Sequence, residues 1–428
     1  MVEPTPTRDW SVVALLLSLT CSSTALMLQE TVLGKQVFDI SGRELDLGLL
    51  GLAEFAPALL LVLVTGSIAD RFDRRRVAAA GLVGQMVMTA GVLAYVATKP
   101  TAVGPIFGLV FGFGIARAFS SPAALALPAD IVEPERVPWV VARYSGTWQL
   151  ASIVGPVLGG FLYAGDNRAP YVAVLLLAGT AAIAVLVVRP HPRAVREPAI
   201  VAELAGPIDP TIAPDQPKAR FGEAVEGVRF IRTQPVLLGA ISLDLFAVLF
   251  GGAVALLPAL CKDQLHVGAV GLGWLRAAGG IGAASVTFCL AWRPLRRNVG
   301  RNLLVAVGVF GAATIVLGVT HQYALAFLAM LVLSGADAIS VFVRATLVPL
   351  ITPTSKRGRV LAVENVFIGA SNELGAFESG VAGQLLGPAG AVVLGGMATL
   401  AVAGSWSALF PDLRCVDGFP DPVEEGVG

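Results

Sequence analysis

Residues Gly66 to Val77 read GSIADRFDRRRV, a run of charge enclosed by two long apolar segments. Its two aspartates and four arginines cannot lie in hydrocarbon, because each charge there would cost roughly 2.5–3.5 kcal/mol even on the lenient insertion scale. The run therefore lies at a membrane surface. Since Lys and Arg collect on the cytoplasmic side of membrane proteins, so many arginines in one short loop predict the inner surface.

The composition is that of a membrane protein. Of 428 residues, 55 % are hydrophobic and only 14 % are charged, with a mean hydropathy of +0.76, whereas about a quarter of the residues of an average soluble domain are charged. The formal net charge is zero, which argues against a nucleic-acid partner, since nucleic-acid-binding domains usually carry a basic face. We therefore expect an all-α protein that crosses the bilayer several times.

A helix needs about 20 residues to cross the hydrocarbon of a bilayer, and apolar runs of that length predict twelve spans. Because twelve is even, both termini lie on one side, and the inner position of residues 66–77 makes that side cytoplasmic. The predicted spans are 11–32, 46–66, 77–97, 102–124, 140–163, 170–188, 236–258, 268–291, 303–319, 323–345, 360–382 and 389–409.

The positions of the basic residues support this topology. Apart from Arg117 and Arg276, which fall within spans, most lysines and arginines lie in segments that the topology places on the cytoplasmic side. A topology with one helix more or one helix fewer would remove this asymmetry of basic residues between the two sides of the membrane. The outer segments hold only Lys35, Arg43, Lys99, Arg168 and Lys262.

The longest break separates the spans into two groups of six. Its Pro-rich composition favours extended, unpacked chain. Basic loops at equivalent positions of both halves suggest a duplicated six-helix unit. We expect a first six-helix bundle over 1–188, a cytoplasmic linker over 189–235, a second bundle over 236–410 and a cytoplasmic tail over 411–428.

The end of the linker has helical character. Phe221, Val225 and Val228 share one face of a helix over residues 221–232, with charged residues on the other sides. Such a helix suits the inner surface of a membrane. A solvated linker helix fits the same pattern equally well.

Residues 66–75, GSIADRFDRR, resemble the signature G-x-x-x-D-R-x-G-R-R/K that transporters of the major facilitator superfamily carry between helices two and three. Asp73 stands where the signature has Gly. The resemblance implies a cytoplasmic latch between helices that breaks as the transporter turns inward, and Asp73 bears on how tight that latch is. The implied latch residues are Gly66, Asp70, Arg71, Arg74 and Arg75.

Span five carries a second resemblance. Residues 151–160, ASIVGPVLGG, are similar to the exporter motif g-x-x-x-G-P-x-x-G-G of the same superfamily, with Ala at the first small position. Small residues let helices approach closely, and a proline inside a helix removes a backbone donor and bends the helix. The motif is either a hinge or plain close packing, and the match at the expected span favours a hinge of Gly155, Pro156, Gly159 and Gly160.

Residues 357–380 look like span eleven of the branch that contains the enterobactin exporter and macrolide-efflux proteins, and residues 255–265 after span seven look similar. In topology, the resemblance covers nearly the whole chain. It implies a major facilitator fold, in which two six-helix bundles are related by a pseudo-two-fold axis. It also implies a secondary exporter of the bacterial inner membrane, driven by proton exchange.

Several ionisable side chains fall within the predicted spans, where such groups usually face a cavity or a partner. Glu54, for example, lies about 12 Å from the outer surface at 1.5 Å per residue. In span eleven, Glu364 lies on a polar stripe whereas Glu373 projects to another face. The candidates for proton coupling or for lining a cavity are Glu54, Arg117, Asp244, Arg276, Asp337 and Glu373.

A carboxyl in a low-dielectric cavity has its charged form disfavoured, which lets it bind and release protons near neutral pH. Our hypothesis is that Glu54 or Asp337 carries a coupled proton. The alternative is that the acids pair permanently with Arg117 or Arg276 and hold helices together.

The sequence contains no G-x-x-x-x-G-K-S/T loop for ATP phosphates, so we expect no cofactor and a proton gradient as the driving force. We predict a non-enzymatic, monomeric transporter that exports a small organic molecule, a drug or a siderophore-like metabolite, by alternating access. Its partners would be that substrate, protons and the lipid bilayer. The alternatives are an importer of a small nutrient and a membrane sensor or scaffold that transports nothing.

Overall fold

The structure is a computed structural model that describes residues 10–189 and 221–420, with backbone only for residues 62–70, 134 and 221–225. The first half contains six long helices, as expected from its apolar runs. They are α1 (Trp10–Ser41), α2 (Glu44–Arg71), α3 (Arg74–Ala97), α4 (Gly104–Ile131), α5 (Val137–Gly165) and α6 (Ala169–Val187), with a 3₁₀ turn at Pro134–Arg136.

The second half follows α8 (Phe221–Thr233), the helix at the end of the predicted linker. Its elements are α9 (Pro235–Phe250), a 3₁₀ turn (Ala253–Leu256), α10 (Leu257–Ala259), a π turn (Leu260–Gln264), α11 (Ala269–Trp292), α12 (Val299–Val319), α13 (Tyr323–Ile351), α14 (Thr354–Leu409) and α15 (Pro411–Arg414). Residues 235–264 form one discontinuous crossing, interrupted after Phe250 by two glycines.

α14 supplies two crossings, because its backbone leaves helical geometry at Gly387, where φ is 75° and ψ is 158°. This conformation is essentially restricted to glycine, and Pro388 follows it. Nine of the described helical stretches are long and apolar enough to cross a membrane. With the second arm of α14, and with α2 and α5, these make the twelve crossings that the sequence predicts.

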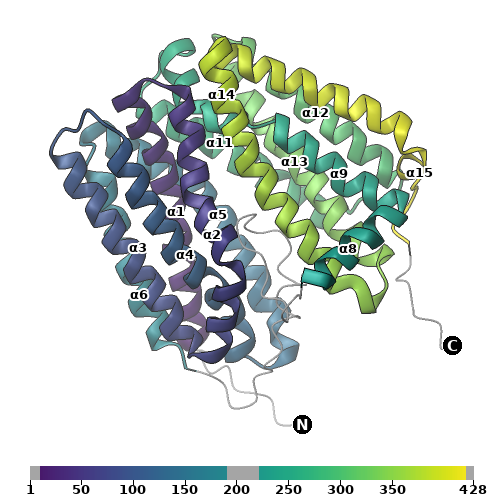
Figure 1. The fold of residues 1–428 in the computed structure, drawn as a ribbon, viewed down its shortest axis with the longest axis horizontal. Helices are drawn as coiled ribbons and strands as arrows, with labels where there is room; N and C mark the ends of the chain where they lie inside the picture. Colours follow the sequence, from purple (N-terminus) through teal and green to yellow (C-terminus); the bar gives the residue numbers. More distant parts are fainter. Residues whose placement is uncertain (1–9, 190–220, 421–428) are drawn as a thin grey trace.

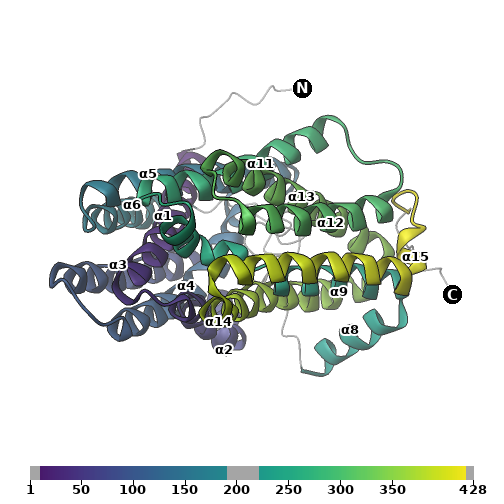
Figure 2. The same cartoon turned by 90° about the horizontal axis from the view of Figure 1, so that it is seen from above.

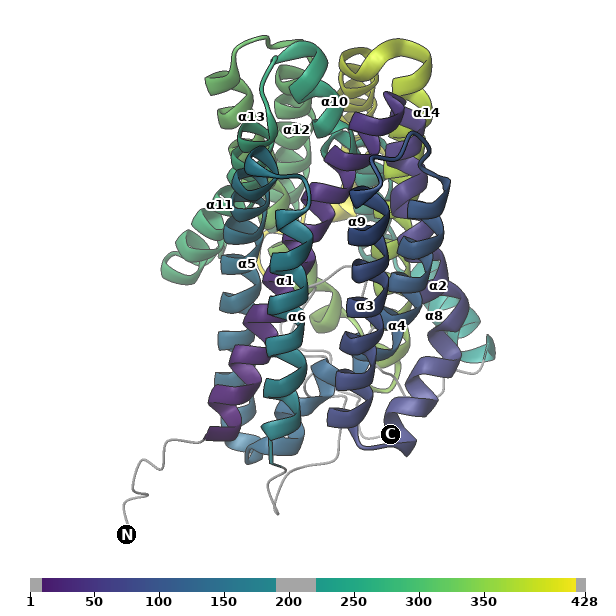
Figure 3. The same cartoon turned by 90° about the vertical axis from the view of Figure 1, so that its left-hand side faces the viewer.

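Figure 1 shows the two halves side by side, with α1–α6 in purple to blue and α8–α15 in teal to yellow. The same division is visible from above in Figure 2. In Figure 3 the first half faces the viewer, with α3 and α6 in front and α4 between α3 and α2. The ribbons of the halves lie close together near the kink of α14 at Gly387 and diverge toward the end where α1 begins.

The halves are joined through small residues at the end near the kink. A Cβ on Gly160 of α5 would lie 2.5 Å from the carbonyl oxygen of Ala269, and one on Gly273 of α11 would lie 2.4 Å from that of Pro156. Gly48 of α2 packs in the same way on Phe377 of α14. Such contacts allow backbones to approach closely.

An apolar cluster reinforces this junction, because Phe38 of α1 and Leu47 of α2 are buried among second-half residues such as Leu256 and Leu272. Within each half, apolar side chains fill the space between the helices. Val12, Leu127 and Val140 belong to one first-half cluster.

Residues after α15 return to the start of α12. The backbone N–H of Asn298 donates to the carboxylate of Asp417 at 3.1 Å. The N–H groups of Val299 and Gly300 donate to the carbonyls of Asp417 and Val416 at 3.2 and 3.0 Å. These bonds satisfy N–H groups that the first turn of a helix leaves without an intrahelical partner.

Candidate functional site

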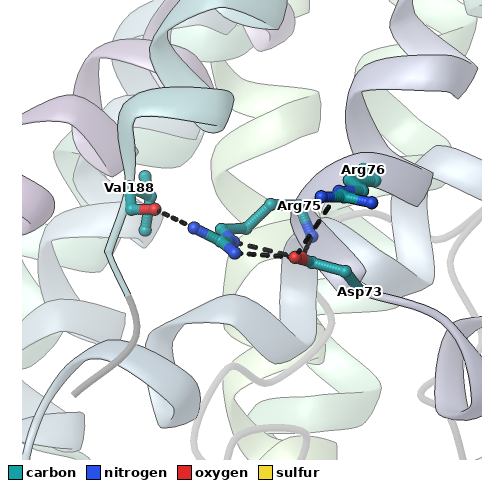
Figure 4. Close-up of polar contacts among 4 residues, drawn as sticks. All are labelled: Asp73, Arg75, Arg76 and Val188. Carbon is teal, nitrogen blue, oxygen red and sulfur yellow. Dashed lines mark hydrogen bonds and ion pairs between the residues drawn. The ribbon is translucent and has the colours of Figure 1, made fainter.

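The charged segment between α2 and α3 is ordered by hydrogen bonds from Arg75 (Figure 4). Asp73 Oδ1 accepts from the backbone N–H of Arg75 at 3.0 Å, so Asp73 is the N-cap of α3. The Arg75 guanidinium lies 2.6 Å from Asp73 Oδ2 and donates to the carbonyl oxygen of Val188 at 2.7 Å. Arg75 therefore ties the start of α3 to the end of α6, and its hydrogen bonds hold the pKa of Asp73 below the usual value.

Arg74 ties the same end of α3 to α4. One of its guanidinium nitrogens donates to both carboxylate oxygens of Asp130, at 3.0 and 3.2 Å. Arg71 is exposed, and the side chain of Asp70 as well as Gly66 fall where only the backbone is described. The predicted latch residues Arg74 and Arg75 thus bind partners within the first half, and a role in gating stays a prediction.

The motif in α5 packs on two neighbours at once. A Cβ on Gly155 would lie 2.9 Å from the backbone nitrogen of Leu28 in α1, and one on Gly159 would lie 3.1 Å from Val32. Gly160 and the carbonyl of Pro156 face α11 of the other half. These residues therefore form both an internal contact and the junction between halves, while hinge motion stays a prediction.

An ionic cluster joins three helices of the first half. Arg117 of α4 lies 2.8 Å from Glu54 of α2 and 3.8 Å from Glu30 of α1. Arg117 is buried, whereas a third of the Glu30 side chain is exposed. The structure thus brings together two of the residues that the sequence singles out, Glu54 and Arg117.

A second ionic cluster lies in the other half. Arg344 of α13 lies 2.7 Å from Asp244 of α9 and 3.5 Å from Glu364 of α14, and all three side chains are less than a tenth exposed. Arg344 is not among the residues predicted from the sequence, because the predicted span ten ends at residue 345. Since α13 continues to Ile351, Arg344 is almost two turns inside the helix. The apolar residues on both sides of Arg344 could have revealed it.

Asp337 belongs to this second cluster without being bonded within it. The charges of Asp244 and Arg344 both act on its carboxyl group. Among the described residues, it has no hydrogen bond or ion pair. One turn along α13, the Ser340 hydroxyl is buried with no hydrogen-bond partner among the described atoms. Three carboxyls, of Asp244, Asp337 and Glu364, therefore share a single guanidinium.

The two remaining candidates lie at the junction of the halves. A Cβ on Gly51 of α2 would lie 2.7 Å from the Glu373 carboxylate of α14.

Arg276 occupies the face of α11 that also carries Gly273 and Gly280, which pack on α5. Its Nε is buried with no hydrogen-bond partner among the described atoms, and the charge of Glu30 acts on it. The six candidates thus fall into two clusters and this junction.

Comparison with known proteins gives the family. The sequence profile described as Major Facilitator Superfamily matches residues 11–376. The chain is 27 % identical over 415 residues to the multidrug efflux pump Tap of Mycolicibacterium fortuitum, covering 89 % of this chain and 91 % of Tap.

Solved structures show the same fold at low sequence identity. A bacterial homologue of the human lysosomal transporter Spinster, inward-facing and occupied, superposes with a TM-score of 0.67 at 16 % identity over 96 % of this chain and 97 % of that one. An auto-inhibited peptide transporter of the POT family gives 0.69 at 12 % identity over 97 % and 99 %. The human organic anion transporter MFSD10 gives 0.61 at 16 % identity over 94 % and 100 %. With its twelve crossings and the profile match over most of its length, this chain belongs to the major facilitator superfamily.

Proposed function

We propose that this transporter exports small organic molecules across the bacterial cytoplasmic membrane in exchange for protons. The observation that carries the proton coupling is the cluster of three carboxyls around Arg344. Export of drugs is supported by the relative named as a multidrug efflux pump, and siderophore-like metabolites are the second substrate class of the proposal.

Charge balance in the second cluster supports proton binding. If Asp244, Asp337 and Glu364 were all ionised, the single guanidinium of Arg344 would leave two negative charges uncompensated. Each uncompensated charge in a buried site costs several kcal/mol. The cluster therefore holds at least one exchangeable proton, and Asp337, which has no ion pair among the described residues, is its first carrier.

Glu54 is the weaker candidate for the coupled proton. Its carboxylate already has a cationic partner, Arg117, at 2.8 Å. The alternative role, holding helices together, fits Glu54 and Arg117 better than it fits Asp337. We expect the substrate to contact Glu30, whose side chain is a third exposed beside Arg117.

Sidedness follows from the positive-inside rule, which assigns the end that carries Arg71–Arg76 to the cytoplasm. The contacts through Gly48, Gly160 and Gly273 then seal the outer side. In this proposal the structure is the state that faces the cytoplasm, and rocking of one half against the other opens the outer side.

Reconstitution in liposomes tests the proposal. An imposed pH gradient should drive ethidium across the membrane together with counter-movement of protons. Asp337→Asn should abolish proton-coupled flux but leave ethidium exchange in the absence of a gradient, whereas Glu226→Gln, which alters an exposed acid of α8, should change neither. Unchanged coupling in both Asp337→Asn and Glu54→Gln would remove these residues from the mechanism.

The direction of flux separates the proposal from its alternatives. An importer would carry its substrate inward down the proton gradient, and its loss would deprive cells of a nutrient without any gain in drug sensitivity. A sensor or scaffold would give no flux that depends on the gradient.

A further inference from the structure

A pocket of about 430 Å³ opens beside the charged start of α3. Its walls are apolar and come from α3 and α4, whereas Asp73 and Arg76 lie at its charged end. The described residues that line it are Phe72, Asp73, Arg76, Val77, Ala80, Gly81, Ala116 and Phe119.

The pocket lies on the side of the first half that faces away from the second half. α3 packs on α4 and α6, and Figure 3 shows α3 and α6 as the helices of this half nearest the viewer. Ala80 is exposed at the pocket, and Val83 and Val87 continue the same exposed stripe along α3. In a membrane-spanning helix such a stripe faces lipid, so the pocket is continuous with a surface that acyl chains cover.

Arg76 is available at the charged end of this pocket. Its side chain is 84 % exposed, and its Nε lies 4.0 Å from Asp73 Oδ2. That carboxylate is already engaged by the shorter contacts of Arg75, which lies on its other side in Figure 4. An exposed guanidinium beside an apolar hollow at the membrane surface suits a ligand with an anionic head and a hydrocarbon tail.

We propose that this pocket binds an anionic phospholipid of the surrounding bilayer, with the phosphate at Arg76 and one acyl chain along Ala80, Val83 and Val87. Two features favour a phospholipid over a soluble anion. First, apart from Asp73 and Arg76, the pocket is lined only by apolar side chains and Gly81. Second, the exposed stripe leads from the membrane surface toward the membrane interior, which is the direction of an acyl chain. Phosphate is a favoured partner of a guanidinium, which can bind it through two parallel hydrogen bonds.

Native mass spectrometry of the purified full-length protein tests the site. Detergent micelles are titrated with phosphatidylglycerol or with phosphatidylcholine of the same acyl chains, and the bound fraction of each is measured. The wild type should retain phosphatidylglycerol in preference to phosphatidylcholine. Arg76→Gln should weaken phosphatidylglycerol binding about fivefold, the loss expected for one basic residue at an anionic lipid surface.

The controls separate charge, shape and folding. Arg76→Lys should keep most of the binding, and Arg301→Gln, which removes an exposed arginine at the start of α12, should leave it unchanged. Ala80→Trp, which fills the pocket, should weaken both lipids. Since Arg76 is exposed, Arg76→Gln should retain the thermal unfolding midpoint of the wild type.

Three outcomes would overturn the proposal. Equal retention of the two lipids by the wild type would exclude recognition of the head-group charge. Unchanged binding in Arg76→Gln would place the lipid elsewhere. Glycerol phosphate has the charge but no acyl chain. If it competed as strongly as phosphatidylglycerol, the site would be assigned to a soluble anion. Transport activity enters none of these readouts, so the test is independent of the proposed export.

Discussion

The guanidinium of Arg344 lies 2.7 Å from the carboxylate of Asp244, and the pair connects α13 to α9 inside the second half. Both side chains are almost fully buried. Burial makes the ion pair sensitive to the loss of either member, because the remaining charge can no longer be hydrated.

Arg344→Met should therefore destabilise the protein strongly. Removal of one partner of a buried pair typically costs about 3–5 kcal/mol, here because Asp244 and Glu364 both lose their cation. Thermal unfolding in detergent measures the effect, with Arg301→Gln as an exposed control. A midpoint for Arg344→Met as high as that of the control would show that the pair contributes little to stability.

Gly273→Ala should disrupt the junction of the halves. The new Cβ would lie 2.4 Å from the carbonyl oxygen of Pro156 and 3.2 Å from the Cα of Gly160, and backbone atoms cannot turn aside as a flexible side chain can. We expect a greater separation of the halves at this end, measured by electron paramagnetic resonance between spin labels at Lys99 and His321, which are both exposed there.

Gly146→Ala, in α5, is the matched control for that change, because nothing lies within 4 Å of the added carbon. It should leave the distance distribution between the labels unchanged. If Gly273→Ala gave the same distribution as the control, close approach of α5 and α11 would not be needed for this state.

Gly387→Ala should strain the turn between the two arms of α14. At φ 75° and ψ 158° a Cβ is unfavourable, and a residue held in such a region costs about 1–3 kcal/mol. We expect a lower unfolding midpoint than for Gly404→Ala, which lies in the second arm with open space around it. Identical midpoints for the two variants would mean that the arms tolerate another connection.

The Asp73 carboxylate should stabilise the start of α3 in a pH-dependent way. Its pKa is lowered in the folded protein, first by the side-chain hydrogen bond from Arg75. A lowered pKa means that the contribution is present above the ordinary pKa of about 4 and is lost as the pH falls through the folded value.

Asp73→Asn tests this contribution and keeps a side-chain oxygen that can cap the helix. The difference in stability between wild type and Asp73→Asn should be present at pH 7 and should disappear at the acid end of a titration. Asp73→Ala, which also loses the cap, should cost about 1 kcal/mol more. A difference that does not change with pH would assign the effect to capping alone.

The architecture could be predicted from sequence because hydrocarbon thickness fixes the length of each span and because charge is excluded from the spans. The twelve crossings and the family are confirmed. Helix interruptions were less visible: the prediction continues span seven through Gly251 and Gly252, where the structure leaves the α-helix. An apolar run shows that a segment is buried in the membrane, but it does not show where the backbone bends.

The candidate site was predictable only in part. Glu54 and Arg117 were identifiable as charges within spans, yet their pairing depends on how α2 and α4 are rotated, which no spacing within either helix determines. Arg344 was missed because the boundary of span ten was placed six residues too early. Asp73, which interrupts the family signature, acts as the cap of α3, a role that becomes visible only with the backbone conformation.

The hydrogen bonds between Asp417 and the first residues of α12 set a limit on how the chain can be shortened for expression. Cleavage before Val416 would expose three amide donors at the beginning of a membrane-crossing helix, and water or detergent head groups would have to replace the lost acceptors. A reporter protein or affinity handle is therefore best joined after residue 420, where the return of the chain to α12 is already complete.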